Sequence, residues 1–277
     1  MRLLSALHPR SQSRSAASRH LAPNRTLQLL GLLAFASSAA AGPNAGGTLI
    51  LGLCEDINCY TDTDNDDYCP YATLTDCASA PYHIDSVAPF LWYAYAAFPD
   101  GSAPRLSGVA FGIDYDAENL VLLNLEKCAD FELASPDWPD PGAGTAVTFT
   151  EAQQSQLTSL YWFAGYDYYG VDMEFALVPH PAQGGVFADD SVPSILDPIA
   201  DFGRIGFYDM PGHLPCPTAL PTGACCIDGV CTVLSLAVCT DLGGTYVGDD
   251  VPCDPNPCVV PLIERSWGRI KSDFREE

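Results

Sequence analysis

Three aspartates at alternate positions form the most suggestive polar cluster of the sequence. Asp62, Asp64 and Asp66 lie in the segment TDTDNDDYC, and this spacing lets successive carboxylates wrap around a calcium ion. The segment departs from a complete EF-hand loop, because Asp67 stands in place of the sharp-turn glycine and Thr73 in place of the bidentate glutamate. Calcium is therefore one candidate cofactor, and an acidic surface loop without a metal is the simpler interpretation.

Aromatic side chains gather in the segment LYWFAGYDYYG. If this segment forms a strand, alternation places Trp162, Tyr166 and Tyr168 on one face. An exposed face of this kind would stack on sugar rings, so these three residues are the candidate ligand-binding platform. The competing and favoured interpretation places both faces in the core or under loops, since most large aromatic residues are at least partly buried.

The sequence offers little for catalysis. A glycoside hydrolase needs two carboxylates, and Glu132 and Glu174, on expected strands, are the best candidates. Outside the first 41 residues the histidines are His83, His180 and His213, and no G-x-S-x-G elbow accompanies them. The sequence also lacks a C-x-x-C redox motif and the lysine of a phosphate-binding loop. These observations favour a non-enzymatic protein.

Twelve cysteines constrain the fold and the compartment. Their even number behind an expected export signal favours disulfides over zinc ligation, which would require paired C-x-x-C knuckles. The disulfide candidates are Cys54, Cys59, Cys69, Cys77, Cys128, Cys216, Cys225, Cys226, Cys231, Cys239, Cys253 and Cys258.

Parity predicts how these cysteines pair. The last six would close three bridges among themselves, and the first four are close enough in sequence to pair locally. Cys216 would then pair with Cys128.

Short apolar runs between turn signals predict the elements that hold these residues. With no helical periodicity among them, they indicate a mainly β protein, an antiparallel β-sandwich or jelly roll. The segment Thr150–Gln154 allows at most one helical turn, and the strands at 91–98 and 157–168 are apolar on both faces and should be central. The expected strands are Thr48–Leu53, Val87–Phe98, Leu106–Tyr115, Leu120–Leu125, Thr145–Thr150, Leu157–Tyr168, Met173–Val178 and Arg204–Tyr208.

The composition divides the chain into four parts. Residues 1–41 predict a signal peptide, because five arginines precede an apolar run that ends in Ala39 and Ala41, which makes Gly42 the expected mature start. Residues 42–215 predict the sandwich domain, and residues 216–258 a disulfide-rich module. In this module TVLSLAVCTDLGG predicts one short helix with Thr232 as its N-cap and Gly243 or Gly244 at its end.

Residues 259–277 form a basic tail. Four of its apolar residues recur with helical spacing, namely Ile263, Trp267, Ile270 and Phe274. This amphipathic segment would dock on the protein itself or be read by a sorting or anchoring machinery.

The cysteine segment GACC…GGTYxGD…CxPNPC resembles a segment of uncharacterised secreted proteins of environmental bacteria. The stretches RLSGVAFGIDYD, CADFEL and FADDSVPSILDPIA are also similar to such proteins. The resemblance implies export to the extracellular space or cell envelope of a bacterium, and it implies no activity.

The charge excludes some partners. Removing residues 1–41 takes away five of the 12 basic residues and none of the 35 acidic ones, so the formal charge falls from −23 to −28. Such a surface repels nucleic acid and anionic membranes, and the apolar run is too short for a transmembrane anchor.

Three functions remain open. The leading prediction is a secreted or cell-surface, non-enzymatic β module that is structural or binds a ligand, carbohydrate or calcium. The alternatives are a secreted polysaccharide hydrolase and a knottin-like protease inhibitor formed by the cysteine module.

Overall fold

The computed structural model describes residues 42–54, 60 and 67–258, and this part of the chain is mainly β, as predicted. Its longer strands follow the expected apolar runs closely, and β1, β4 and β9 have the predicted bounds. In chain order the strands of the sandwich are β1 (Thr48–Leu53), β2 (His83–Ile84), β3 (Phe90–Ala97), β4 (Leu106–Tyr115), β5 (Leu120–Lys127), β6 (Phe131–Ala134), β7 (Gly144–Gln153), β8 (Leu157–Asp167), β9 (Met173–Val178), β10 (Val186–Ala188), β11 (Leu196–Pro198) and β12 (Arg204–Phe207).

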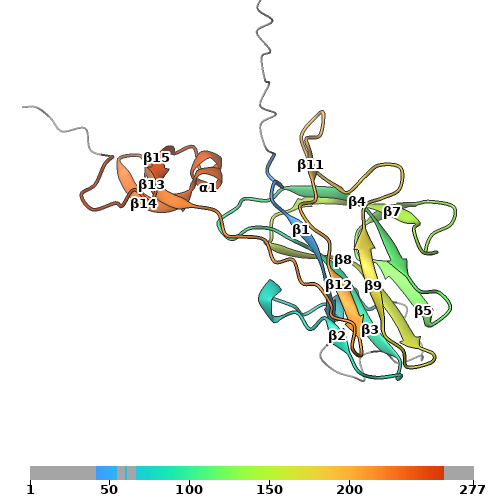
Figure 1. Ribbon diagram of the computed structural model, residues 1–277. Coiled ribbons are helices and arrows are strands. Elements are labelled where there is room, and N and C mark those ends of the chain that lie inside the picture. Colours follow the sequence, from blue (N-terminus) through green and yellow to red (C-terminus); the bar gives the residue numbers. More distant parts are fainter. Residues whose placement is uncertain (1–41, 55–59, 61–66, 259–277) are drawn as a thin grey trace, which may run out of the picture. The chain divides into compact units, whose positions relative to one another are not determined.

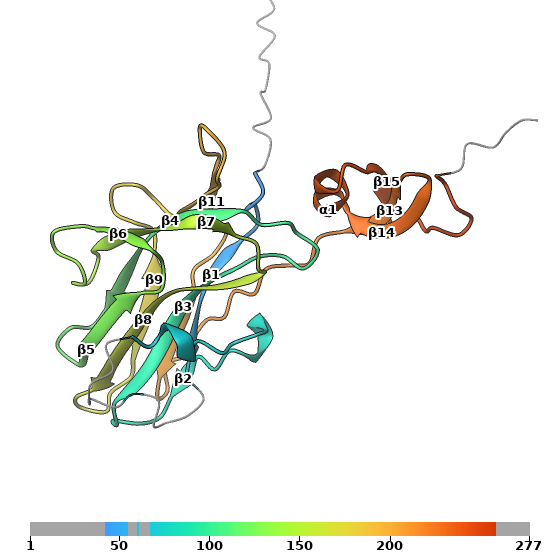
Figure 2. The same cartoon turned by 180° about the vertical axis from the view of Figure 1, so that it is seen from behind.

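Two sheets make up the sandwich (Figures 1 and 2). The smaller sheet has the order β1-β3-β8-β5, and all its pairs are antiparallel. The larger sheet has the order β11-β10-β4-β9-β12-β2, with β7 paired to β4 and β6 paired to β7. Strands β3 and β8 lie in the centre of their sheet, as their apolar faces predicted.

The main core lies between the two sheets. Alternate residues of the smaller sheet, such as Trp92 on β3 and Phe163 on β8, pack there against Phe111 and Phe175 of the larger sheet. The rings of Trp92 and Phe175 meet edge to face at 5.0 Å. Such aromatic pairs add to the free energy that area burial alone provides.

The outer face of the smaller sheet is also buried. Tyr93 and Tyr95 on β3 and Trp162 on β8 belong to a second core cluster, which Tyr68 and Ala80 complete. These last two residues belong to residues 67–82, which we call the roof; it contains two 3-10 turns, η1 (Cys69–Tyr71) and η2 (Cys77–Ser79). A strand that is apolar on both faces therefore has a core on each side.

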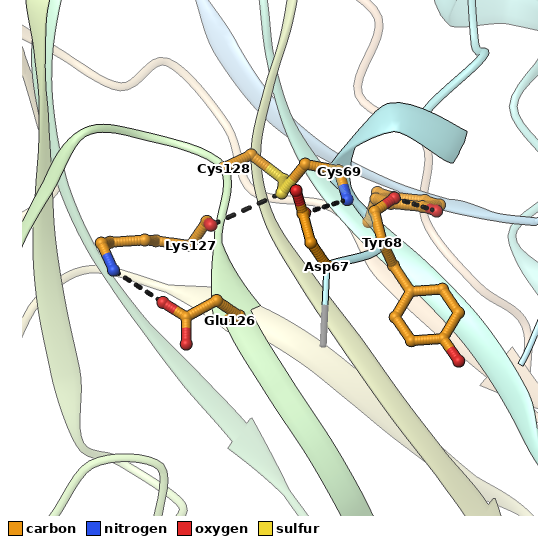
Figure 3. The surroundings of a disulfide bond; sticks show 7 residues. Asp67, Tyr68, Cys69, Glu126, Lys127 and Cys128 are labelled. Atoms are coloured by element: carbon orange, nitrogen blue, oxygen red, sulfur yellow. Dashed lines mark hydrogen bonds and ion pairs between the residues drawn. A yellow bond between two sulfur atoms is a disulfide. The ribbon is translucent and has the colours of Figure 1, made fainter. Parts of the chain in front are cut away.

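Two disulfides hold the roof. Cys69 bonds to Cys128, just after β5, and Cys77 bonds to Cys216, with Cα–Cα distances of 5.4 and 5.7 Å. Figure 3 shows the first bridge, beside which the Asp67 carboxylate accepts the N–H of Cys69.

The predicted pair Cys128–Cys216 is therefore wrong, and so is local pairing of Cys69 and Cys77. The roof crosses the sheet and brings each of these two cysteines to a residue distant in sequence. Cys54 is also disulfide-bonded, and Cys59 lies outside the described residues.

The cysteine-rich segment forms its own small sheet. It has the order β14-β13-β15, from Thr222–Ile227 (β13), Val230–Ser235 (β14) and Thr245–Asp249 (β15). The last six cysteines of the chain pair with one another, as Cys225–Cys239, Cys226–Cys258 and Cys231–Cys253.

The helix of this segment is shorter than predicted. It spans Leu236–Asp241 (α1), and its N-cap is Ser235, whose hydroxyl accepts the N–H of Val238. Thr232 instead lies in β14, paired with Cys225. Gly243 follows the helix with φ +70°, the conformation expected for a glycine at a helix end.

The one-turn helix considered for Thr150–Gln154 is absent from the described chain, because β7 continues to Gln153 and pairs that residue with Leu106. No helix of the described residues is long and apolar enough to cross a membrane.

Candidate ligand-binding site

The structure separates the three residues of the predicted aromatic platform. Trp162 is fully buried, and its ring meets that of Tyr68 in the roof at 4.9 Å. It is therefore a core residue and is not available for stacking on a sugar from solvent. Tyr166 is half-buried, and Tyr168, which follows the end of β8, is exposed.

The exposed aromatic surface lies in the turn between β8 and β9. We call residues 166–170 the tyrosine turn. Tyr168 and Tyr169 are 58% and 67% exposed, and their rings meet edge to face at 4.6 Å. Tyr166 extends this group, since its ring lies 6.3 Å from that of Tyr168. Adjacent exposed aromatic rings of this size are unusual and mark a candidate binding surface.

A buried carboxylate fixes the shape of this turn. Asp167 is almost fully buried and accepts the N–H groups of Tyr169, at 3.0 Å, and Val171, at 2.9 Å. Gly170 has φ +69°, a conformation that side chains rarely adopt. The carboxylate and the glycine together hold the two tyrosines outward, so little conformational entropy remains to be lost when a ligand binds.

Acidic groups border the tyrosines. The N–H of Tyr168 donates to the carbonyl of Asn119, which ties the tyrosine turn to the β4–β5 turn. There Asp116 accepts hydrogen bonds from the Asn119 side chain, at 2.6 Å, and the Glu118 N–H, at 2.9 Å, and these bonds lower the pKa of Asp116. Exposed carboxylates beside aromatic rings suit a sugar, whose hydroxyl groups donate and whose C–H faces stack.

Two clefts open beside the roof, but both are small. One has a volume of about 200 Å³ and lies between Tyr71 and Thr75 of the roof and Tyr93 and Tyr95 of β3. The other, about 220 Å³, lies beside the Cys77–Cys216 bridge. Typical ligand pockets enclose roughly 300–1,000 Å³, so the tyrosine turn is the stronger candidate.

Burial alters the chemistry of the tyrosines under the roof. It raises the pKa of Tyr93 and Tyr95 well above the usual range. The hydroxyl of Tyr93 donates to the carbonyl of Tyr68, at 2.9 Å, so it is committed to holding the roof. These hydroxyls are structural.

The candidate calcium ligands Asp62, Asp64 and Asp66 lie outside the described residues. Within the described ranges, no group of three histidine, cysteine or acidic residues is placed to hold a metal ion.

The segment FADDSVPSILDPIADFG contains four aspartates, and each one takes part in hydrogen bonds or ion pairs of the fold. Asp190 pairs with Arg105, and Asp201 with His213. Asp189 accepts hydrogen bonds from Ser191 and Ile195, and Asp197 from Gly42 and Asn44.

The two candidate catalytic carboxylates are far apart. Glu132 on β6 and Glu174 on β9 lie three strand positions apart, which alone separates them by about 14 Å across the larger sheet, and the register offsets them further along the strands. The two carboxylates of a glycosidase lie within about 10 Å of each other. Glu132 accepts the hydroxyl of Thr145 at 2.7 Å, and Glu174 pairs with Arg204 at 3.4 Å.

Each of the three candidate histidines has a different hydrogen-bond partner. His83 contacts Asp85, and His213 contacts Asp201. His180 accepts the N–H groups of Ala182 and Gln183 through Nδ1 and so organises a turn.

Sequence reasoning missed Tyr169 and Asp167 as site residues. The segment YDYYG contains the signal. An aspartate whose carboxylate accepts the N–H of the residue two positions later, with a glycine close behind, is typical of a turn. Treating the whole segment as a strand placed Tyr169 on the opposite face. Two exposed apolar residues on β6, Phe131 and Leu133, were also missed.

No family model matches the sequence, and no curated protein matches it. Among solved structures the chain is similar to a cohesin module from a family 33 glycoside hydrolase of Clostridium perfringens, with 8% identity, a TM-score of 0.35, and coverage of 46% of this chain and 89% of that chain. The seventh ScaB type I cohesin from Pseudobacteroides cellulosolvens has 12% identity and a TM-score of 0.33, with coverage of 48% and 90%.

A chain of a type I cohesin–dockerin complex from Clostridium thermocellum has 9% identity and a TM-score of 0.33, with coverage of 58% and 99%. At these identities the likeness concerns the fold alone.

Proposed function

We propose that this protein is an exported, non-enzymatic β module that binds an extracellular glycan at the tyrosine turn. The observation that carries the proposal is the exposed pair Tyr168 and Tyr169 on a turn fixed by the buried Asp167. An aromatic pair held rigidly outward stacks on a sugar without first having to be ordered.

The disulfides support the exported part of the proposal. Five disulfides join cysteines of the described residues. Such bridges would be reduced in a bacterial cytosol, and they persist in oxidising compartments. The predicted signal peptide agrees with this location.

A glycan array tests the proposal. The oxidised protein should bind a subset of glycans, and Tyr168→Ala and Tyr169→Ala should each weaken binding about tenfold, since aromatic stacking is worth about 0.5–1.5 kcal/mol beyond area burial. Tyr71→Ala is the matched control, because Tyr71 is similarly exposed at 55% but lies in the roof. Unchanged binding by both turn variants, or an equal loss with Tyr71→Ala, would contradict the proposal.

The same array distinguishes the role of calcium. Binding that survives a chelator is expected if the tyrosines suffice. Binding that is lost with the chelator would move the site to a metal loop and place Asp62, Asp64 and Asp66 under test.

A second candidate function is docking of a protein segment on β6. Phe131 and Leu133 project from the same face of this strand and are 60% and 61% exposed. In the described chain β6 pairs on one side, with β7, which leaves an edge that an extended segment of a partner would join by backbone hydrogen bonds. Pull-down with extracellular proteins of the same cell, using wild type and Leu133→Lys, would test it; retention of the same partner by the variant would refute it.

A further inference from the structure

Asp197 on β11 is one of three buried aspartates in the described chain, and its hydrogen-bond donors lie at the expected mature start. It is 3% exposed, and its two oxygens accept the backbone N–H groups of Gly42, at 2.7 Å, and Asn44, at 3.0 Å. Burying a carboxylate costs free energy unless positive charge and hydrogen bonds compensate for the lost water. Two neutral N–H donors supply hydrogen bonds but no charge.

Within the described part of the chain, the side chains supply no cation to Asp197. That part contains three basic side chains, and each one pairs with a different carboxylate: Arg105 with Asp190, Lys127 with Glu126, and Arg204 with Glu174.

The backbone around Gly42 is built to approach this carboxylate. A Cβ atom at Gly42 would overlap Asp197 Oδ2 and lie 2.7 Å from Ile195 Cγ2, so only glycine allows this contact. Asn44 is fully buried, and its side chain exchanges two hydrogen bonds with the backbone of Arg105. Asp197 and Ile195 therefore enclose Gly42 itself, and the hydrogen bonds of Asn44 fix the chain two residues later.

We propose that cleavage after Ala41 turns the nitrogen of Gly42 into an α-ammonium group that forms an ion pair with Asp197. In this hydrolysis water adds OH to the carbonyl carbon of Ala41 and H to the nitrogen of Gly42, and the C–N bond breaks. The released amine takes up a proton at neutral pH. Removal of the predicted signal peptide thereby supplies the positive charge that Asp197 otherwise lacks.

The position of the cut matters in this arrangement. A cut after Ala41 puts the charge on the atom that already lies 2.7 Å from the carboxylate. A cut one residue earlier leaves Gly42 with a neutral amide. Cleavage after Ala41 therefore adds an ion pair to the fold, whereas cleavage at a neighbouring peptide bond does not.

Two start forms of the mature chain test the proposal: residues 42–277 and residues 41–277, which retain Ala41. The added alanine should lower the melting temperature by about 2–6 °C, because a charge-assisted hydrogen bond becomes a neutral one. In Asp197→Asn this difference between the start forms should vanish. Equal melting temperatures of the two wild-type forms would overturn the proposal, as would a difference that persists in Asp197→Asn.

Asp189→Asn is the matched control. Asp189 is equally buried at 3%, but its carboxylate accepts hydrogen bonds from Ser191 and Ile195 and not from the Gly42 nitrogen. This variant should be destabilised by the same amount in both start forms, so it retains the difference between them.

A third measurement needs no substitution. Acylation of the α-amine in the folded 42–277 chain should be at least about tenfold slower than in the unfolded chain, because the ion pair keeps the amine protonated and covered. Equal rates would overturn the proposal. N-terminal sequencing of the full chain after export should find Gly42, and a different first residue would overturn it as well.

Discussion

At the scale of single residues, Asp167 shows how a buried side chain shapes a surface it does not belong to. Its carboxylate accepts the N–H groups of Tyr169 and Val171 and so sets the direction of the exposed rings. The aromatic cluster was predictable from the segment LYWFAGYDYYG. Which of its members reach solvent was not predictable, because that depends on tertiary contacts such as the one between Trp162 and Tyr68 of the roof.

Replacing Asp167 with alanine should weaken glycan binding even though the tyrosines remain. Two partly buried N–H groups would lose their acceptor, at a cost of about 1 kcal/mol each, and the turn would no longer hold the rings together. We expect a lower melting temperature and a binding constant about tenfold weaker by titration calorimetry. Asp172→Ala, an exposed carboxylate next to the same turn, is the control. Full affinity in Asp167→Ala would show that the turn needs no anchor.

The capping of the β4–β5 turn predicts how binding depends on pH. Hydrogen bonds from Asn119 and Glu118 lower the pKa of Asp116 below its unfolded value, which is about 3.9. The ionised Asp116 therefore stabilises the β4–β5 turn fully above about pH 4, and this stabilisation is lost as the pH falls through the lower pKa of the folded state. Since Asn119 holds Tyr168, binding should stay constant from about pH 7 to 4 and then decline.

Binding measured along this pH series in Asp116→Asn provides the comparison. The variant does not titrate, so its affinity should change less at acidic pH than that of the wild type. A decline of wild-type binding already between about pH 7 and 5 would point to a different group.

At the scale of elements, the roof explains the double-sided hydrophobicity of β3 and β8. Leu91, Tyr93 and Tyr95 pack under the roof, while Trp92 and Ala94 face the other sheet. Period-two patterns and turn residues predicted the long strands well, because these strands carry the core. The short strands β2, β10 and β11 contain two or three residues each, too few for alternation to be recognised.

Removing the Cys69–Cys128 bridge should loosen the roof. The bridge closes a loop with a sequence separation of 59 residues, and native disulfides stabilise typically by about 2–4 kcal/mol. In Cys69→Ala/Cys128→Ala we expect a loss of unfolding free energy in this range by urea denaturation. Iodide should also quench tryptophan fluorescence more strongly, because the roof covers Trp162.

Cys231→Ala/Cys253→Ala removes a bridge of the three-stranded sheet instead. Iodide quenching should stay unchanged in this control, because the three tryptophans of the described chain belong to the sandwich. Equal quenching in both double variants would contradict the role assigned to the roof.

At the scale of the whole molecule, acidic charge dominates. The full sequence has 35 acidic and 12 basic residues, and the expected mature chain is more acidic still. Negative charges held close together in the folded state repel one another and destabilise it. Screening of this repulsion by salt should therefore stabilise the fold. Raising the salt from about 10 mM to 0.5 M should increase the melting temperature by about 2–4 °C, equivalent to about 1 kcal/mol.

Sodium and potassium chloride should act alike in this experiment. A fall of the melting temperature with salt would mean that ion pairs such as Arg105–Asp190 outweigh the general repulsion. An extra rise with millimolar calcium alone would indicate a specific site.

Disulfide connectivity shows the limit of sequence reasoning at this scale. Counting cysteines established that Cys216 needs an upstream partner, and it has one in Cys77. The choice of Cys128 failed because proximity along the chain says nothing about a segment that crosses a sheet.

The most direct test of glycan binding at the tyrosine turn is an NMR titration of protein labelled on its tyrosine rings, using a glycan selected by the array. We predict saturable shifts of the Tyr168 and Tyr169 ring signals, a smaller shift of Tyr166 and none of Tyr71. Binding that leaves the signals of Tyr168 and Tyr169 unmoved, or shifts confined to tyrosines of the roof, would contradict it.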